Sequence, residues 1–275
     1  MINIEIFRMK RLFLVVLAVH AVHVSAQDYP MINSFKGPVK QATITMQRDN
    51  GDANLYYGGT SGARSKTVCW YDSIGRLLEE ANYMDDEVQR GYVCQYTINN
   101  VYMQYNYDAN GVIQGSFARF QLDSLGNLLE SKRYEDGKFL CGDSTVYDAD
   151  GRKIEFYETH IKSKKLMLRY IYEYDSIGRL CKVSDLFHGT GDVYTIEYFP
   201  NGSYTQHHID KKGKKWDIKF ILDKKGQLTR MESSNMSCRY SHFDKYGNWL
   251  QLISTTNTPA GQFTTITERV IEYYE

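Results

Sequence analysis

The chain has 275 residues, of which 42% are hydrophobic and 14% aromatic, and its formal net charge is zero. With 23 tyrosines and only 4 prolines, this composition excludes a disordered or collagen-like chain and indicates a globular protein rich in β-structure. The balanced charge argues against nucleic acid as the main partner, because phosphate binding requires an excess of basic residues on one face.

Residues 1–26 have the pattern of a secretory signal peptide. Met9-Lys10-Arg11 precede an apolar run from Leu12 to Val19, and Val24-Ser25-Ala26 supply small residues for cleavage. Either Met1 or Met9 serves as the start. The apolar run is too short to span a bilayer, and no later segment is apolar enough to do so. We therefore predict an exported protein without a transmembrane segment in the mature chain.

The mature chain is predicted to contain a short lead-in and one domain. Residues 27–38 form an irregular lead-in, and residues 39–275 form a single domain of β-hairpin repeats, which starts with the β pattern of Val39 to Gln47. The cysteines are odd in number and widely spaced, so they do not predict a disulfide framework. They are Cys69, Cys94, Cys141, Cys181 and Cys238.

One stretch of sequence occurs twice in full. Tyr71-Asp72-Ser73-Ile74-Gly75-Arg76-Leu77 returns as Tyr174-Asp175-Ser176-Ile177-Gly178-Arg179-Leu180. An aspartate at the start of a turn accepts hydrogen bonds from the backbone N–H groups that follow, and a glycine three positions later supplies the left-handed conformation that closes the loop. Tyrosine and leucine suit a pleated, half-buried surface. The pattern predicts the tip of a β-hairpin.

Degenerate copies repeat the same spacing along the chain. They place further structural turns at Asp108 and Gly111, Asp123 and Gly126, Asp148 and Gly151, Asp210 and Gly213, Asp223 and Gly226, and Asp244 and Gly247. A variant copy, Tyr198-Phe199-Pro200-Asn201-Gly202, has an Asn-Gly tip instead. Asp-x-x-Gly spacing therefore divides most of the chain into hairpins.

The segments between the tips alternate with a period of two. Tyr170, Tyr172 and Tyr174 fall on one face of their segment, whereas Ile171 and Glu173 fall on the other. Hairpin spacing predicts about 16 to 20 short strands. An open sheet rarely exceeds about ten strands without curling. We therefore expect an all-β fold: a long antiparallel meander that forms one strongly curved or coiled sheet, a partial shell lined on its concave side by Tyr, Leu and Phe.

From about Thr67 to Trp249, the repeated Tyr-Asp-x-x-Gly-Arg-Leu resembles the YD repeat of Rhs-type proteins. Gly247-Asn248-Trp249 and the ending Glu268 to Tyr274 are similar to small exported YD-repeat-like proteins of Gram-negative bacteria. In large Rhs proteins such repeats build a shell around a toxin domain, but this chain has too few repeats to close a large shell. The resemblance implies the fold and a tendency to bind saccharides or proteins, and the signal-peptide pattern predicts a periplasmic or extracellular location in a Gram-negative bacterium. The resemblance supplies no catalytic residues.

No cluster in the sequence predicts catalytic, cofactor-binding or metal-binding residues. His207 and His208 are adjacent on an expected strand, so they point to opposite faces and cannot share a metal ion. The turn role already accounts for Asp148 and Asp150, which otherwise begin a calcium-loop pattern. We therefore predict no cofactor.

The aromatic residues provide the candidate binding site. Trp70, Trp216 and Trp249 each lie within a few residues of a predicted tip, and two or three of them on one exposed face would form a platform for stacking a ligand. The sequence thus predicts an exported, non-enzymatic module that binds a glycan or a protein at the cell envelope or outside the cell. Two alternatives remain: a hydrolase of envelope polymers with carboxylates in a concave groove, and an antidote-like partner of a secreted toxin.

Overall fold

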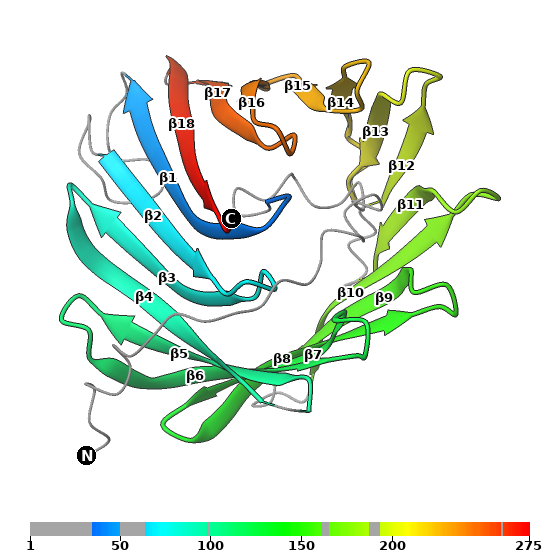
Figure 1. Cartoon of the computed structure of the whole chain (residues 1–275). Coiled ribbons are helices and arrows are strands. Elements are labelled where there is room, and N and C mark those ends of the chain that lie inside the picture. The colour runs from blue at the N-terminus through cyan, green and yellow to red at the C-terminus, as the bar shows by residue number, and fades with distance from the viewer. Residues whose placement is uncertain (1–34, 50–63, 98, 161–164, 187–192, 260) are drawn as a thin grey trace.

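The computed structural model describes residues 35–49, 64–97, 99–160, 165–186, 193–259 and 261–275. The predicted signal peptide and the first part of the lead-in lie outside these residues. All regular elements of the described chain are β-strands (Figure 1). They are β1 Val39–Asp49, β2 Arg64–Tyr71, β3 Leu77–Met84, β4 Glu87–Tyr96, β5 Val101–Asp108, β6 Ile113–Leu122, β7 Leu128–Glu135, β8 Lys138–Tyr147, β9 Lys153–His160, β10 Lys165–Tyr174, β11 Leu180–Asp185, β12 Val193–Tyr198, β13 Tyr204–Ile209, β14 Lys215–Leu222, β15 Leu228–Glu232, β16 Met236–Phe243, β17 Trp249–Thr258 and β18 Gly261–Tyr273.

These elements form one 18-stranded antiparallel sheet in which each strand pairs with its neighbours in sequence. The predicted all-β meander is therefore confirmed. The expectation of an open, partial shell is wrong, because β1 pairs with β18 as well as with β2 and the sheet closes into a barrel (Figure 1). Closure satisfies the backbone N–H and C=O groups that two free edges would expose.

The contact between the first and last strands is extensive. The register runs from Val39 opposite Tyr273 to Asp49 opposite Thr264. Lys36, which precedes β1, is held by the side-chain amide of Asn248. Lys36 N donates to Asn248 Oδ1 at 2.6 Å, and Asn248 Nδ2 donates to the Lys36 carbonyl at 2.9 Å. Asn248 is 4% exposed, so these bonds lie in a shielded environment. The start of the described chain is thus fastened to the tip between β16 and β17.

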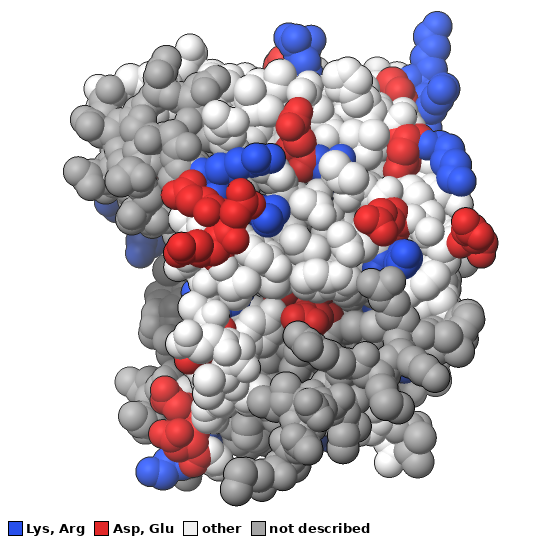
Figure 2. Space-filling view, turned by 60° about the vertical axis from the view of Figure 1, so that its left-hand side comes forward, with Lys and Arg blue, Asp and Glu red and all other residues white. Residues whose placement is uncertain are grey.

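The two faces of the barrel wall differ in burial. In β14, Ile218 and Phe220 are buried, whereas the alternating Asp217 and Lys219 are exposed. Side chains converge on the concave side of a closed sheet and spread apart on its convex side, so the buried set faces inward. On the face shown in Figure 2, side chains of both charges are scattered among uncharged residues.

Two hydrophobic clusters lie on the inward face from β10 to β17. One gathers Ile218, Phe220, Met231, Cys238, Tyr240, Trp249 and Leu252; the other gathers Tyr172, Leu180, Val183 and Ile196. The partly buried Tyr204 packs against both clusters and joins them. The wall from β10 to β17 is therefore held by cross-strand packing as well as by backbone hydrogen bonds.

Candidate functional site

The repeated heptad builds a hairpin tip around a buried carboxylate. Asp72 is 1% exposed, and its Oδ1 accepts hydrogen bonds from Ile74 N at 3.1 Å and Arg76 N at 2.9 Å. Arg76 Nε donates to Asp72 Oδ2 at 2.8 Å. Gly75 has φ 77°, the left-handed conformation in which glycine is favoured. The tip is thus a local network of three hydrogen bonds around the Asp72 carboxylate.

The same backbone arrangement is found at the other predicted turns. Each aspartate carboxylate accepts hydrogen bonds from the backbone N–H groups two and four residues later, and each glycine three residues later has positive φ. The pairs are Asp108 and Gly111, Asp123 and Gly126, Asp148 and Gly151, Asp175 and Gly178, Asp223 and Gly226, and Asp244 and Gly247. These aspartates and glycines therefore form the hairpin turns of the fold.

Most of these tips lie at one end of the barrel, which we call the tip end. It contains the turns after the even-numbered strands β2, β6, β8, β10, β14 and β16. The tips of Asp108 and Asp210 follow the odd-numbered strands β5 and β13, so they lie at the opposite end. The sequence repeat therefore does not follow the alternation of the strands strictly.

Tyrosines connect four of the tips to the next hairpin. Tyr198, at the end of β12, donates from its hydroxyl to the Leu180 carbonyl at 3.0 Å, and the Arg179 guanidinium lies over the Tyr198 ring at 4.3 Å. Tyr96 makes the same pair of contacts with Leu77 and Arg76. The arginine of the motif thus binds its own aspartate and packs on the tyrosine two strands further along the chain.

Acid should loosen these tips. The backbone N–H of Arg179, and then its side chain, lower the pKa of Asp175 in spite of desolvation. A carboxylate with a lowered pKa stabilises the fold above its unfolded pKa of about 3.9, and this contribution disappears as the pH falls. We expect the free energy of unfolding to decrease as the pH is lowered through about 4, as measured by urea denaturation.

The Asp175→Asn variant provides the control for this prediction. Its free energy of unfolding should depend less steeply on pH than that of the wild type between pH 5 and the acid limit, because one titrating group with a lowered pKa is gone. Identical slopes for the two proteins would contradict the assignment of Asp175 as an ionised turn residue.

The structure does not bring the three candidate tryptophans together. Trp249 is 7% exposed and packs on Tyr240, with the Arg269 guanidinium 3.4 Å from its ring centroid. Trp216 is partly buried and stacks on His208 at 5.0 Å. Trp70 lies on β2, separated from the strand of Trp249 by β1 and β18. Trp249 is therefore part of the core and is not available as a ligand platform.

Other aromatic rings form cross-strand stacks. Tyr102 and Phe120 are 4.4 Å apart with an interplanar angle of 7°, and Phe117 and Tyr134 are 4.7 Å apart at 9°. Rings stacked in this way cover one another's faces, which are the surfaces that would pack on a sugar. The tyrosine excess therefore serves mainly to pack neighbouring strands.

The histidines adopt separate structural roles. His207 lies between two carboxylates, with Nδ1 3.0 Å from Asp217 Oδ1 and Nε2 3.3 Å from Glu197 Oε2. The hydrogen bond with Asp217, with a further contribution from Glu197, raises the pKa of His207. His208 instead packs between Tyr194 and Trp216. Among the described residues, no group of three or more His, Cys, Asp or Glu side chains is arranged to hold a metal ion.

The five cysteines are free thiols. Burial, followed by the nearby charge of Glu80, raises the pKa of Cys69 and of Cys94 to about 12. A thiol with a raised pKa is a poor nucleophile near neutral pH. These two cysteines therefore act as small apolar residues of the wall.

Two carboxylates face each other across β8 and β9. Asp143 and Glu158 are register partners, and Asp143 Oδ2 accepts a hydrogen bond from Ser131 Oγ at 2.7 Å. Arg133 Nη2 lies 3.8 Å from the same oxygen. Neither carboxylate lines the two clefts described next.

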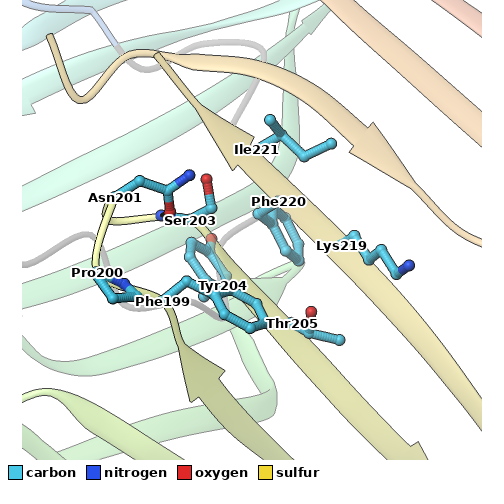
Figure 3. Close-up of a pocket in the computed structure, with 9 residues that line it drawn as sticks. All are labelled: Phe199, Pro200, Asn201, Ser203, Tyr204, Thr205, Lys219, Phe220 and Ile221. Atoms are coloured by element: carbon cyan, nitrogen blue, oxygen red, sulfur yellow. Dashed lines mark hydrogen bonds between the residues drawn. The ribbon is translucent and has the colours of Figure 1, made fainter. Parts of the chain in front are cut away.

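A cleft of about 540 Å³ opens beside the variant tip between β12 and β13 (Figure 3). It is lined mainly by apolar and aromatic groups: Phe199, Pro200, Asn201, Ser203, Tyr204, Thr205, Lys219, Phe220 and Ile221. This size lies within the range of about 300 to 1,000 Å³ typical of small-molecule sites. We call it the Phe199 cleft.

The sequence of the variant tip explains the exposed ring. Phe199 occupies the position of the turn aspartate, and its side chain is 41% exposed. The backbone turn is kept, since Gly202 N donates to the Phe199 carbonyl at 2.9 Å. Asn201 Oδ1 accepts from Ser203 N at 3.1 Å, and Ser203 Oγ accepts from Leu222 N at 3.0 Å. An apolar side chain is thus held at the surface by a tip that is fastened to its neighbour.

A second, more polar cleft of about 330 Å³ lies on β15 to β17. Its lining includes Arg230 and Arg239, which face each other as register partners, and the hydroxyls of Ser237 and Thr255. We call it the arginine cleft. Neither cleft was predicted from the sequence, although the departure of Phe199 from the repeat was a visible signal.

Comparison with known proteins gives a likeness of fold. No protein-family model and no curated protein matches the chain. A porin-like protein from Bacteroides uniformis superposes with a TM-score of 0.51 at 10% identity, covering 86% of this chain and 99% of the other. At this identity the match shows a shared fold alone.

Two further structures are more distant. A porin-like protein from Bacteroides vulgatus gives a TM-score of 0.37 at 11% identity, covering 86% of this chain and 98% of that one. The TcdB2–TccC3 complex gives 0.28 at 12% identity, covering 68% of this chain and 15% of that one. These scores are too low to support an argument. The chain is thus similar in fold to a porin-like protein.

Proposed function

We propose that this chain is an exported, non-enzymatic β-barrel of the YD-repeat type that binds a glycan through the Phe199 cleft. The observation that carries the proposal is the exposed Phe199 ring, held at the variant tip where the other tips described above carry a turn aspartate. A pyranose ring has apolar C–H faces and hydroxyl groups. The cleft offers an aromatic ring for the former and the exposed Asn201 and Lys219 for the latter.

The scarcity of carboxylates in the two clefts favours binding over hydrolysis. Glycoside hydrolysis requires two carboxylates that flank one bond. The Phe199 cleft is lined by none, and the arginine cleft is lined by Glu232 alone. The signal-peptide pattern at residues 1–26 supports an envelope or extracellular location in a Gram-negative bacterium. No helix among the described residues is long and apolar enough to cross a membrane.

A glycan array probed with the exported chain tests the proposal. We expect one or more saccharides to be retained, and Phe199→Ala to weaken their binding about tenfold, since loss of a buried ring contact costs about 1 to 2 kcal/mol. Ile177→Ala is the matched control. Ile177 is a 73% exposed side chain on the neighbouring tip between β10 and β11, and its loss should leave binding unchanged.

Two outcomes would contradict the proposal. One is an array on which the exported chain retains nothing above background. The other is Phe199→Ala binding as tightly as the wild type. A pull-down that captures a protein through Phe199, without saccharide binding, would replace the glycan by a protein partner, a secreted toxin among the candidates.

A further inference from the structure

The two clefts are neighbours along the barrel wall. Register places Thr205, Lys219, Glu232, Ser237 and Thr255 in one row across β13, β14, β15, β16 and β17. The first two residues line the Phe199 cleft and the last three line the arginine cleft. Adjacent strands are about 4.8 Å apart, so the centres of the two clefts are separated by a few strand spacings. A ligand of a few sugar units can span both.

A parallel row concentrates positive charge in the arginine cleft. Ile221, Arg230, Arg239 and Ile253 are successive register partners on β14, β15, β16 and β17. Like charges directly opposite each other on neighbouring strands destabilise a sheet. The isoleucines on either side provide no compensating charge. The arginine pair is therefore a local electrostatic cost of the folded barrel.

Neutralisation of this pair is incomplete. Arg230 Nη1 lies 3.1 Å from Glu232 Oε1, and both side chains are exposed to a large extent. Arg239 is exposed and makes no ion pair within the described part of the chain. The hydroxyls of Ser237 and Thr255 face the same cleft. Two guanidinium groups and two hydroxyls thus surround a volume of about 330 Å³ with a single carboxylate.

We propose that the arginine cleft binds a tetrahedral oxyanion, the sulfate or phosphate ester of a saccharide. Guanidinium groups bind such anions through paired N–H donors, and hydroxyls complete the coordination. The anion removes the repulsion between Arg230 and Arg239. The assignment of the anion to a saccharide rests on the proposed function. The anion site itself stands on the arginine pair and its surroundings.

The site is tested by titrating the full exported chain with inorganic sulfate and, separately, with inorganic phosphate. Binding is measured from NMR chemical-shift changes and from the shift in melting temperature. Wild type should bind in the millimolar range, and Arg239→Gln should bind at least tenfold more weakly. Glu232→Gln should bind more tightly, because it releases Arg230 from its ion pair. Arg169→Gln, which removes a partly exposed arginine paired with Glu155 on another part of the wall, should bind as wild type does.

Folding is not expected to confound this result. Removing Arg239 relieves a repulsion, so without anion the melting temperature of Arg239→Gln should equal or exceed that of the wild type. Equal anion affinity in wild type and Arg239→Gln overturns the inference. So does an equal loss of affinity in Arg169→Gln, which would show non-specific attraction to surface charge.

Sulfated and phosphorylated saccharides, with their neutral parents, separate this inference from the proposed function. If both hold, Phe199→Ala weakens the neutral and the charged saccharides, whereas Arg239→Gln weakens the charged ones alone. Binding of the inorganic anions through Arg239 without saccharide binding leaves the anion site and removes the glycan proposal. Saccharide binding through Phe199 with equal affinity for charged and neutral forms removes the anion subsite.

Discussion

Replacing Asp72 by alanine is expected to lower the free energy of unfolding by about 2 to 4 kcal/mol. The Asp72 carboxylate is 1% exposed and accepts hydrogen bonds from Ile74 N, Arg76 N and Arg76 Nε. In the variant, two turn N–H groups and the partly exposed guanidinium of Arg76 lose their acceptor. Arg76 also packs on Tyr96, so the link to the next hairpin should weaken as well. Urea denaturation measures the effect.

The Asp210→Ala variant is the matched control. Asp210 accepts the same two backbone hydrogen bonds, from Lys212 N and Lys214 N at 2.8 Å each, and makes no ion pair with an arginine of its own tip. Its loss should cost about 1 kcal/mol. If both variants lose the same stability, the arginine and the burial of Asp72 contribute nothing. If neither variant loses stability, the turn carboxylates have no structural role.

Replacing Gly91 by alanine is expected to destabilise the barrel by about 1 to 3 kcal/mol, as overpacking does. Gly91 is buried in β4, and a Cβ atom built there would collide with the hydroxyl of Tyr107 and with the backbone carbonyl of Glu80. The Tyr107 side chain lies across this glycine, and its hydroxyl donates to Glu79 Oε1 at 2.9 Å. The ring could rotate away, but the backbone carbonyl cannot move without disturbing the pairing of β3 with β4.

Gly115→Ala distinguishes this packing effect from a general penalty on strand glycines. A Cβ atom at Gly115 would meet the end of the Asp136 side chain, which is free to move. We expect its free energy of unfolding to stay within about 0.5 kcal/mol of the wild type. The double variant Gly91→Ala with Tyr107→Ala should recover little, because the collision with the Glu80 carbonyl remains. Full recovery would place the conflict in the Tyr107 ring alone.

The sequence alone was sufficient for the local structure. Asp72 and Gly75 are three residues apart, and the hydrogen bonds that define the tip join residues no more than four positions apart. Period-two alternation, as in Tyr170 to Tyr174, then predicted the strands. The predicted range of about 16 to 20 strands includes the 18 that are observed. Such features depend on the backbone conformation of a few consecutive residues, so they can be predicted without the fold.

The binding clefts could be predicted only in part. Phe199 breaks the repeat visibly, because it stands where the other copies carry an aspartate. The pairing of Arg230 with Arg239 depends on the register between β15 and β16, and the cover of Gly91 by Tyr107 depends on the register between β4 and β5. The tryptophans were candidates because they lie near tips in the sequence. Nearness to a tip does not reveal burial, and Trp249 is buried by residues from other strands.

Barrel closure was decided by tertiary structure. Whether an 18-stranded meander ends in two free edges or closes depends on the meeting of β1 with β18, whose partners Val39 and Tyr273 lie at opposite ends of the described chain. The clamp between Lys36 and Asn248 joins residues 212 positions apart. The accumulated twist and tilt of all the strands bring these edges together, and no local pattern encodes that sum. The sequence by itself therefore determined the hairpins and their tips, and the closed wall that sets two clefts side by side arose from pairing at long range.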